Sequence, residues 1–305
     1  MTSGALKGRV LVTGAAGMLG SELLLAAPRG VQGVGTDLVP GPAGGPSVER
    51  VGVDLTRAAD VEELLASTAD LSGVIHAAAY TAVDEAEEEE ALARRVNADA
   101  AENLARAAAR RGVPMVLVST DFVFDGEKRS PYRPDDAPAP LCVYGRTKLE
   151  GELRSRAAHP AGLVVLRTQW LYGPRGKHFP GTILRLAAER EELQVVRDQV
   201  GSPTSTLELA PALWDVLARA RPGVLHGACE GLASWYDFAL ATLELAGKST
   251  RVRPCTTAEF PRPARRPAYS VLDSSALAAL RGRTLKPWRA ALSDFLSDSN
   301  PGGGP

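Results

Sequence analysis

The first half of the chain alternates short apolar runs with longer segments in which apolar residues recur every three or four positions. Uninterrupted apolar runs are typical of strands buried on both faces, and the segments between them are typical of amphipathic helices. The runs that predict strands are Arg9–Thr13, Val31–Thr36, Val51–Val53, Gly73–His76, Met115–Ser119 and Leu163–Arg167. The segments that predict helices are Gly17–Ala27, Arg57–Ser67, Ala91–Arg111 and Val143–Arg156. We therefore predict an α/β fold with a doubly wound parallel sheet.

The alternation becomes irregular after Trp170. We expect residues 1–170 to form the core that holds the sheet, and residues 171–305 to form mainly a smaller α+β lobe. Some segments within residues 200–245 are expected to return to the core, and the run Gly223–Gly227 is the candidate for a further strand.

Three other stretches are interpreted without assigning chemistry to them. Arg251–Pro267 contains four prolines and predicts an extended loop. The acidic run Glu87–Glu90 is interpreted as the solvated start of a helix, where carboxylates suit the helix dipole, rather than as a cation site. The tail Gly302–Pro305 is expected to be disordered.

Composition excludes several classes of protein. The 35 basic and 36 acidic residues give a net charge of −1, which argues against nucleic-acid binding or attachment to an anionic membrane. The three cysteines, Cys142, Cys229 and Cys255, are far apart, so we expect neither a disulfide framework nor a zinc site. No apolar run reaches the roughly 18 residues of a transmembrane helix, and no signal peptide is evident. We therefore expect a cytoplasmic protein.

A glycine-rich loop connects the first predicted strand to the first predicted helix. Gly14, Gly17 and Gly20 follow the spacing G-x-x-G-x-x-G. Gly14 permits a tight turn, Gly17 allows a pyrophosphate to approach the backbone, and Gly20 lets the helix pack closely on the strand. The helix N-terminus then offers free N–H groups to phosphates. Because the loop lies between strand and helix, it indicates a Rossmann-type dinucleotide site rather than an unoccupied turn.

Three later strand ends are candidates for the adenosine side of this site. Asp37 lies 23 residues after the first glycine and suits a ribose diol, which favours NADH because a carboxylate repels a 2′-phosphate; the alternative is a turn residue. Asp54, followed by Leu55, is placed to meet the adenine amino group. His76 is interpreted as a packed strand-end residue. The small residues after it, which would let the cofactor pass close to the backbone, are Ala77, Ala78 and Ala79.

A candidate catalytic set follows the fifth predicted strand. Thr120 ends this strand, where open α/β sheets bind ligands, and can donate a hydrogen bond to a substrate carbonyl. Tyr144 and Lys148 are four residues apart on one face of a predicted helix. We expect the Lys148 ammonium to lower the pKa of the Tyr144 phenol from about 10, making it a usable proton donor or acceptor. A Tyr-x-x-x-Lys pair alone is common on helices, but its combination with the glycine loop and the strand-end threonine indicates a site.

With these motifs in place, the sequence resembles the extended short-chain dehydrogenase/reductases and, more closely, the dTDP-4-dehydrorhamnose reductase family. The resemblance covers most of the chain and includes segments outside the cofactor core. The matching segments are VTGAAGMLGSE (12–22), HAAAYTAVDEAE (76–87), VNADAAENLARAA (96–108), STDFVFDG (119–126), PLCVYGRTKLEGE (140–152), LRTQWLYG (166–173), QVGSPT (199–204) and TTAEFPRPARRPAYSVLD (256–273).

The resemblance implies a role for each matching residue of the reaction site. Tyr144 would be the general acid, and Lys148 would orient the cofactor and tune Tyr144. Thr120 would bind the C4 carbonyl of the sugar, with Asp121 beside it. Trp170 would pack near the sugar.

Further implied roles concern the cofactor, the loops and a metal. Gly17, Met18 and Leu19 would form the pyrophosphate loop. Arg265 and Arg266 would either help bind the substrate diphosphate or only structure their loop. Glu22 matches a family position associated with a Mg²⁺ ion at a dimer contact, so Mg²⁺ and a homodimer stay open, and no metal ligands are assigned.

The implied reaction is the reduction by NADPH or NADH of the C4 ketone of dTDP-4-dehydro-6-deoxy-L-mannose, or a close dTDP-4-keto-6-deoxysugar, to dTDP-L-rhamnose or its counterpart. Two departures from the family are Phe122, where it often has tyrosine, and Thr147, where it usually has serine. A 4,6-dehydratase would need a glutamate at Phe122. A nucleotide-sugar 4-epimerase, and a non-catalytic regulatory subunit of the same fold, remain alternatives.

Overall fold

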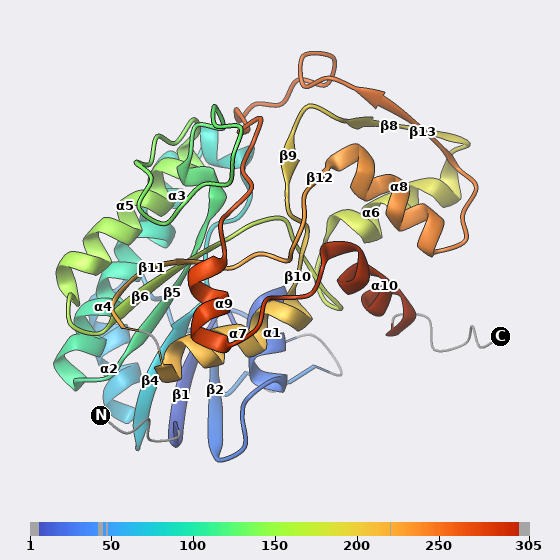
Figure 1. Ribbon diagram of the computed structural model, residues 1–305. Helices are drawn as coiled ribbons and strands as arrows, with labels where there is room; N and C mark the ends of the chain where they lie inside the picture. The colour runs from blue at the N-terminus through green and yellow to red at the C-terminus, as the bar shows by residue number, and fades with distance from the viewer. Residues whose placement is uncertain (1–5, 42–44, 47, 220, 299–305) are drawn as a thin grey trace.

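A seven-stranded, entirely parallel sheet forms the centre of the computed structural model, which describes residues 6–41, 45–46, 48–219 and 221–298 (Figure 1). The strand order is β11-β6-β5-β4-β1-β2-β3. The strands are β1 (Gly8–Thr13), β2 (Val31–Asp37), β3 (Arg50–Val51), β4 (Leu71–His76), β5 (Met115–Thr120), β6 (Leu163–Thr168) and β11 (Gly223–His226). The order reverses direction between β1 and β4, which confirms the predicted doubly wound Rossmann-type fold. The predicted disordered tail, residues 302–305, lies outside the described residues.

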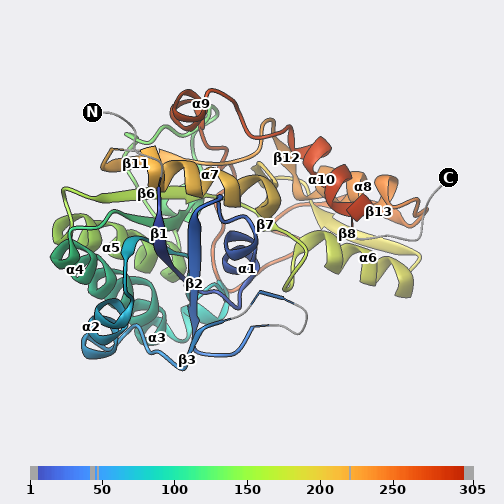
Figure 2. The same ribbon diagram turned by 90° about the horizontal axis from the view of Figure 1, so that it is seen from below.

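Alternate residues of each strand supply two separate hydrophobic layers. Val10 and Val12 of β1 face one cluster, whereas Leu11 between them faces the other. Helices α1, α7 and α9 cover the first face, and α2 and α4 cover the second, with α5 beside α4 (Figure 2). These helices are α1 (Met18–Leu25), α2 (Ala58–Ser67), α4 (Ala100–Arg111), α5 (Val143–Ala158), α7 (Thr206–Arg219) and α9 (Ser275–Arg281). Both faces are therefore buried, as the uninterrupted apolar strands predict.

The prediction of a single long helix over Ala91–Arg111 is wrong for the middle of this segment. The segment divides into α3 (Glu90–Arg94), a π-helical turn η2 (Arg95–Asp99) and α4. In a π-helical turn each N–H bonds to the carbonyl five residues back instead of four, and such turns are frequent at functional sites. Here the turn sets the Asn97 side chain beside the Tyr80 backbone and the Thr147 hydroxyl. Apolar periodicity does not reveal such a local change in hydrogen bonding.

The second half of the chain contributes to the sheet and also builds structure outside it. Strand β11 pairs in parallel with β6 at the edge of the sheet. Beside the sheet, strand β8 (Glu192–Val196) pairs in parallel with β13 (Arg251–Cys255). Helices α6 and α8 pack on this pair, and α10 packs on α8 (Figure 1). These helices are α6 (Phe179–Glu189), α8 (Trp235–Leu245) and α10 (Trp288–Asp298). The division of the chain at residue 170 stays a prediction.

The extended loop predicted over Arg251–Pro267 is wrong for its first five residues, which form β13. Pro254 lies inside this strand, and proline removes a backbone donor. A two-stranded sheet has only edge strands, where proline is tolerated.

Two pairs of very short strands complete the fold: β7 (Leu171–Tyr172) with β10 (Thr204–Ser205), and β9 (Val200–Gly201) with β12 (Ala233–Ser234). Across the residues that the structure describes, no helix is both long and apolar enough to cross a membrane.

Candidate active site

The glycine loop forms a tight turn between β1 and α1. Gly14 has a φ of +69°, and a Cβ there would lie 2.7 Å from the Ala78 backbone nitrogen. A Cβ at Gly20 would overlap the Gly14 carbonyl oxygen, so this glycine is required by the packing of α1. At Gly17, by contrast, a Cβ would meet only the Gly14 oxygen, at 3.1 Å. The fold itself therefore requires Gly14 and Gly20, whereas Gly17 is exposed and its own packing requires a glycine less strictly.

Met18 and Leu19 open α1 directly after this loop. The residue that precedes the helix, Gly17, provides no side-chain cap, and its backbone is extended. The first N–H groups of α1 therefore have no capping side chain and can bind an anion. Leu19 is buried in the core and anchors this helix end on the sheet. Both residues thus lie where the sequence predicts the pyrophosphate loop.

The predicted adenosine-binding carboxylates are both fixed by local hydrogen bonds. One Asp37 carboxylate oxygen accepts a hydrogen bond from the Ala16 N–H at 3.0 Å, which ties the end of β2 to the glycine loop. Asp54 accepts hydrogen bonds from the Thr56 N–H at 3.0 Å and the Thr56 hydroxyl at 2.7 Å. Leu55 packs against the core cluster under α2 and α4. Asp37 thus borders the glycine loop, and Asp54 shapes the turn before α2; their contacts with adenosine stay predictions.

The segment after β4 crosses directly over the glycine loop. The Ala78 N–H donates to the Thr13 hydroxyl at 3.3 Å, and Ala77 and Ala79 flank this contact. His76 is buried, with Nδ1 2.6 Å from the Thr13 hydroxyl. Burial lowers the pKa of His76 to about 3, and the charge of Lys148 adds to this effect. His76 is therefore a neutral packed residue, as predicted.

Helix α5 carries Tyr144 and Lys148 and is fixed at its start by two close contacts. The Val143 N–H at its first residue donates to a Glu87 carboxylate oxygen at 2.8 Å, so one member of the acidic run anchors this helix. A Cβ at Gly145 would overlap the Phe122 carbonyl oxygen, which shows how closely α5 approaches the segment after β5. The interpretation of residues 87–90 as a merely solvated helix start is therefore incomplete.

Tyr144 and Thr120 lie together at the carboxyl end of β5. The Thr120 hydroxyl donates to Asp121 Oδ1 at 3.1 Å and accepts a hydrogen bond from the Phe122 N–H at 3.2 Å. Burial strongly raises the pKa of the Tyr144 phenol, and its hydrogen bond with Thr120 only partly offsets this effect. The prediction that Lys148 lowers the pKa of Tyr144 is therefore wrong for this geometry: the phenol is held in its protonated form.

The Lys148 side chain, one helical turn after Tyr144, is buried. Its ammonium group donates to the Val118 carbonyl oxygen at 2.9 Å. Burial lowers the pKa of Lys148 to about 8, and the negative charge of Glu152 opposes this effect. Because a pKa of about 8 lies close to physiological pH, a change in a neighbouring charge would change the protonation of Lys148.

Asp121 and Phe122 complete the wall of the site beside Thr120. Asp121 is only 1% exposed, and burial raises the pKa of its carboxyl to about 6, while hydrogen bonds from Ser270 and Thr120 oppose the rise. The Phe122 ring meets the Tyr144 ring edge-on, with centroids 5.5 Å apart. Phe122 therefore packs against the phenol and cannot supply the acid–base group that a glutamate would provide.

Trp170 is held in an unusual conformation. Its φ is +48°, a left-handed value rare for a bulky residue and frequent at functional sites. Its indole stacks on Trp235, with ring centroids 3.6 Å apart, and the Trp235 N–H donates to the Gln199 side-chain oxygen at 3.1 Å. Sequence reasoning missed Trp235 and Gln199, because only the fold brings the start of α8 and the segment before β9 under Trp170.

The two arginines of the ARRP segment differ in their surroundings. Arg266 forms two hydrogen bonds of 2.9 Å to the Asp84 carboxylate, and a third to the Ala264 carbonyl oxygen. Arg265 is exposed. Of the two roles considered for Arg266, structuring its loop is the one that these contacts support.

Glu22 has a cationic partner within the same chain. The Arg175 guanidinium lies 2.5 Å from its carboxylate oxygen, and burial raises the pKa of this carboxyl. Within the described part of the chain, no group of three or more His, Cys, Asp or Glu side chains is arranged to hold a metal ion. The surroundings of Glu22 therefore suit an ion pair better than a Mg²⁺ ion.

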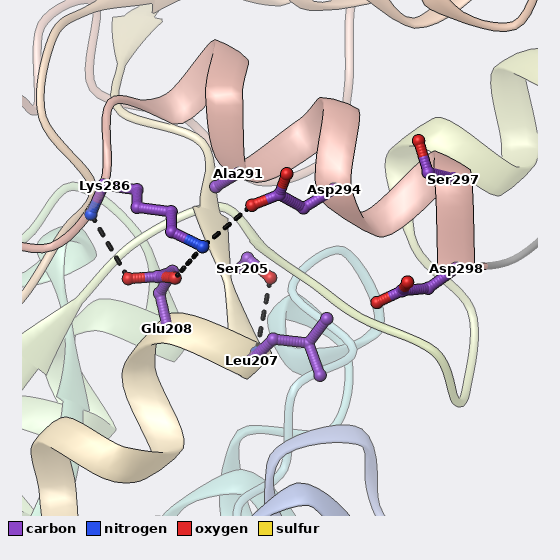
Figure 3. A pocket seen from close by; sticks show the side chains of 8 residues that line it. All are labelled: Ser205, Leu207, Glu208, Lys286, Ala291, Asp294, Ser297 and Asp298. Carbon is purple, nitrogen blue, oxygen red and sulfur yellow. Dashed lines mark hydrogen bonds and ion pairs between the residues drawn. The ribbon is translucent and has the colours of Figure 1, made fainter.

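A hollow of about 430 Å³ lies between the start of α7 and α10, away from all of these residues (Figure 3). Lys286 crosses it, with its ammonium 3.3 Å from Glu208 and 2.8 Å from Asp294. The charges of Lys286, Glu208 and Asp294 thus pair with one another, and none of the predicted site residues lines the hollow.

Comparison with known proteins agrees with this arrangement. Residues 8–300 match the family model described as the RmlD substrate binding domain. A dTDP-4-dehydrorhamnose reductase of Mycobacterium tuberculosis is 44% identical over 296 residues, which cover 95% of this chain and 92% of the relative. A probable dTDP-4,6-dihydroxy-2-methyloxan-3-one 4-ketoreductase of Streptomyces antibioticus is 40% identical over 95% of each chain.

A solved structure gives the same result at the level of the fold. The dTDP-4-dehydrorhamnose reductase of Bacillus anthracis, in complex with NADP, superposes with a TM-score of 0.88 at 33% identity, covering 96% of this chain and 99% of the other. The extent of both the sequence and the structural match shows that the chain belongs to the dTDP-4-dehydrorhamnose reductase family.

Proposed function

We propose that this protein reduces the C4 ketone of dTDP-4-dehydro-6-deoxy-L-mannose to give dTDP-L-rhamnose, with NADPH or NADH as the reductant. Membership of the reductase family supports this reaction. The observation that carries it is the meeting of the Tyr144 phenol with the Thr120 hydroxyl at the carboxyl end of β5, with the buried Lys148 ammonium bonded to the same strand. A close dTDP-4-keto-6-deoxysugar is the nearest variant of this substrate, since one relative is named as such a ketoreductase.

When bound, the reduced nicotinamide supplies the hydride that adds to C4 of the sugar. Tyr144 donates its phenolic proton to the carbonyl oxygen as negative charge develops there. The raised pKa of this phenol keeps the proton in place until that moment. Thr120 donates a hydrogen bond to the same oxygen, and the Lys148 ammonium would orient the bound cofactor.

The dinucleotide would lie along the carboxyl ends of β1, β2 and β4. Asp37 would accept hydrogen bonds from the adenosine ribose, and its hydrogen bond from the Ala16 N–H fixes it for this role. Its carboxylate would repel a 2′-phosphate, which favours NADH. The family relative from Bacillus anthracis holds NADP, so both cofactors belong in the test. The residues proposed to contact the cofactor are Gly14, Gly17, Met18, Leu19, Asp37, Asp54, Leu55, Ala77, Ala78, Ala79, Tyr144 and Lys148.

The sugar would bind between Thr120, Asp121 and Trp170. The Trp170 indole, backed by Trp235, offers an apolar face to a 6-deoxysugar ring. The three free cysteines suit a reducing compartment, and we propose the cytoplasm. A homodimer is proposed only on the resemblance.

The proposal is tested by adding dTDP-4-keto-6-deoxy sugars that differ at C3 and C5 to the protein with NADPH or NADH. We expect stoichiometric oxidation of the cofactor and a product hydroxyl at C4. A 4-epimerase would interconvert C4 epimers with no net consumption of cofactor, and a regulatory subunit would bind dinucleotide without turnover. Either result with every sugar would contradict the proposal.

A further inference from the structure

A fully buried ion pair lies under the catalytic set. The Arg167 guanidinium donates to both Glu152 carboxylate oxygens, from Nε to Oε1 at 3.0 Å and from Nη2 to Oε2 at 2.7 Å. The side chains are 4% and 2% exposed. Ser119 adds a third hydrogen bond, from its hydroxyl to Oε1 at 2.5 Å. Burying two charges is costly, and apolar residues of similar size often pack equally well, so the pair calls for an explanation.

Glu152 continues the catalytic face of α5. Tyr144, Lys148 and Glu152 are spaced four residues apart, so they follow one another along one side of the helix. Three successive residues of β5 meet this row. Thr120 contacts Tyr144, the Val118 carbonyl accepts from Lys148, and Ser119 donates to Glu152. The ion pair is therefore the next layer below the reacting groups.

Glu152 is the anion that most favours the charged form of Lys148. Of the charged groups around Lys148, its negative charge is the one that offsets the cost of burial. His76, which faces Lys148 from β4, is neutral, and Tyr144 above it is protonated. Arg167 approaches from β6 and is itself a cation, but both carboxylate oxygens hold it. One buried anion thus serves two buried cations.

Arg167 in turn fixes the position of the carboxylate. Its guanidinium lies over the Phe124 ring, 5.1 Å from the centroid, and its charge helps to keep the neighbouring His226 neutral. Together with Ser119 it leaves the carboxylate only one orientation. Position and charge of Glu152 are therefore both set before any ligand binds.

We propose that Glu152, oriented by Arg167 and Ser119, is a positioning residue that keeps Lys148 charged and in place for the reaction. This inference rests on the proposed reduction, in which Lys148 acts as an ammonium. Glu152 touches neither substrate nor cofactor. Its effect is transmitted through Lys148 and should therefore depend on pH.

The test compares Glu152→Gln with the wild type across pH 6–10, measuring kcat with the 4-keto sugar that the wild type reduces. Loss of one nearby negative charge should move the alkaline fall of kcat down by about one pH unit or more. Glu150→Gln is the matched control, because Glu150 lies on the same helix but pairs with Arg94 and Arg154 on its exposed side. It should leave the profile unchanged.

A second variant guards against simple unfolding. Glu152→Gln leaves Arg167 buried without a counter-charge, so Glu152→Gln combined with Arg167→Met removes both charges. If the double variant also shows the shifted alkaline fall, the charge of Glu152 is responsible. If either folded variant keeps the wild-type profile, or loses stability with no change in the profile, Glu152 is only structural and the inference is wrong.

A readout without sugar separates this inference from the proposed function. The dissociation constant of NADPH, followed by fluorescence over the same pH range, should weaken at lower pH in Glu152→Gln than in the wild type. If the wild type reduces none of the sugars, the proposed function fails, while the binding profile still decides the role of Glu152. An unchanged binding profile would overturn the inference.

Discussion

Tyr144 and Lys148 are adjacent on one helix face, yet burial shifts their pKa values in opposite directions. It raises the pKa of the phenol and lowers the pKa of the ammonium, since in each case the charged form is disfavoured. The spacing of these residues and the position of Thr120 could be predicted from the sequence. Their protonation could not, because it depends on desolvation and on partners such as Glu152 that only the fold supplies.

Tyr144→Phe tests the proton donor directly. We expect kcat to fall by about 10²–10⁴-fold, the usual contribution of a positioned acid. The dissociation constant of NADPH should change little, because the ring and its contact with Phe122 are kept. Steady-state kinetics and fluorescence titration check the two values. Full activity in this variant would rule out Tyr144 as the acid.

Asp121 illustrates a group whose role costs stability. Its folded-state pKa of about 6 lies above the value of 3.8 for a free carboxyl, so its ionisation destabilises the fold as the pH rises through this range. Asp121→Asn should therefore raise the free energy of unfolding by about 1–3 kcal/mol at pH 8, and the gain should shrink as the pH falls from 6 towards 4. Urea unfolding at several pH values measures this.

The matched control for Asp121 is Asp125→Asn. The Tyr132 hydroxyl donates to the Asp125 carboxylate at 2.6 Å, and this hydrogen bond holds the pKa of Asp125 below its usual value. The substitution should lower stability at pH 8, opposite in sign to Asp121→Asn. If Asp121→Asn were less stable than the wild type at pH 8, the account of its burial would be wrong.

At the scale of elements, the glycine loop separates what folding requires from what a ligand requires. Gly20→Ala would press a methyl group on the Gly14 carbonyl, so we expect a loss of about 1–3 kcal/mol of stability. Gly17→Ala meets a single contact at 3.1 Å and should stay nearly as stable, but bind NADPH at least about tenfold more weakly.

Thermal unfolding without cofactor and fluorescence titration with NADPH distinguish the two glycine variants. Weakened folding in Gly17→Ala, together with unchanged NADPH binding, would show that this glycine is structural rather than part of the phosphate site.

Most core elements could be predicted from apolar runs and helical periodicity, because seven strands with both faces covered leave a clear pattern. Two elements could not. The π-helical turn η2 differs from its neighbours by one residue in the spacing of its hydrogen bonds, and Asn97 bonds there to segments far away in sequence. Strand β13 contains Pro254, and its pairing with β8 depends on the tertiary fold.

At the scale of the whole molecule, single ion pairs join segments distant in sequence. Arg175, in the loop that leads to α6, reaches Glu22 of α1, and Arg266, between β13 and α9, reaches Asp84 after β4. No local pattern in the sequence identifies such partners. Sequence matching to a family left two roles open for Arg266, and its hydrogen bonds to Asp84 support the structural one.

Arg175→Met tests the first of these connections. It leaves the buried Glu22 carboxylate without its cation, which should cost about 1–3 kcal/mol of stability near pH 8. Because Glu22 can then take up a proton, the loss should diminish as the pH falls. Arg185→Met, at an exposed pair with Glu189, should change stability by less than about 0.5 kcal/mol. Equal losses of stability in both variants would mean that the Glu22–Arg175 pair stabilises the fold no more than an exposed ion pair does.

The central claim is that this protein delivers a hydride to C4 of the sugar. The most direct measurement supplies NADPH, or NADH, that carries deuterium in place of the transferable hydrogen, together with dTDP-4-dehydro-6-deoxy-L-mannose, and locates the label by NMR and mass spectrometry. We predict dTDP-L-rhamnose with one deuterium at C4. Recovery of unlabelled product, or of label at any other carbon, would contradict the account.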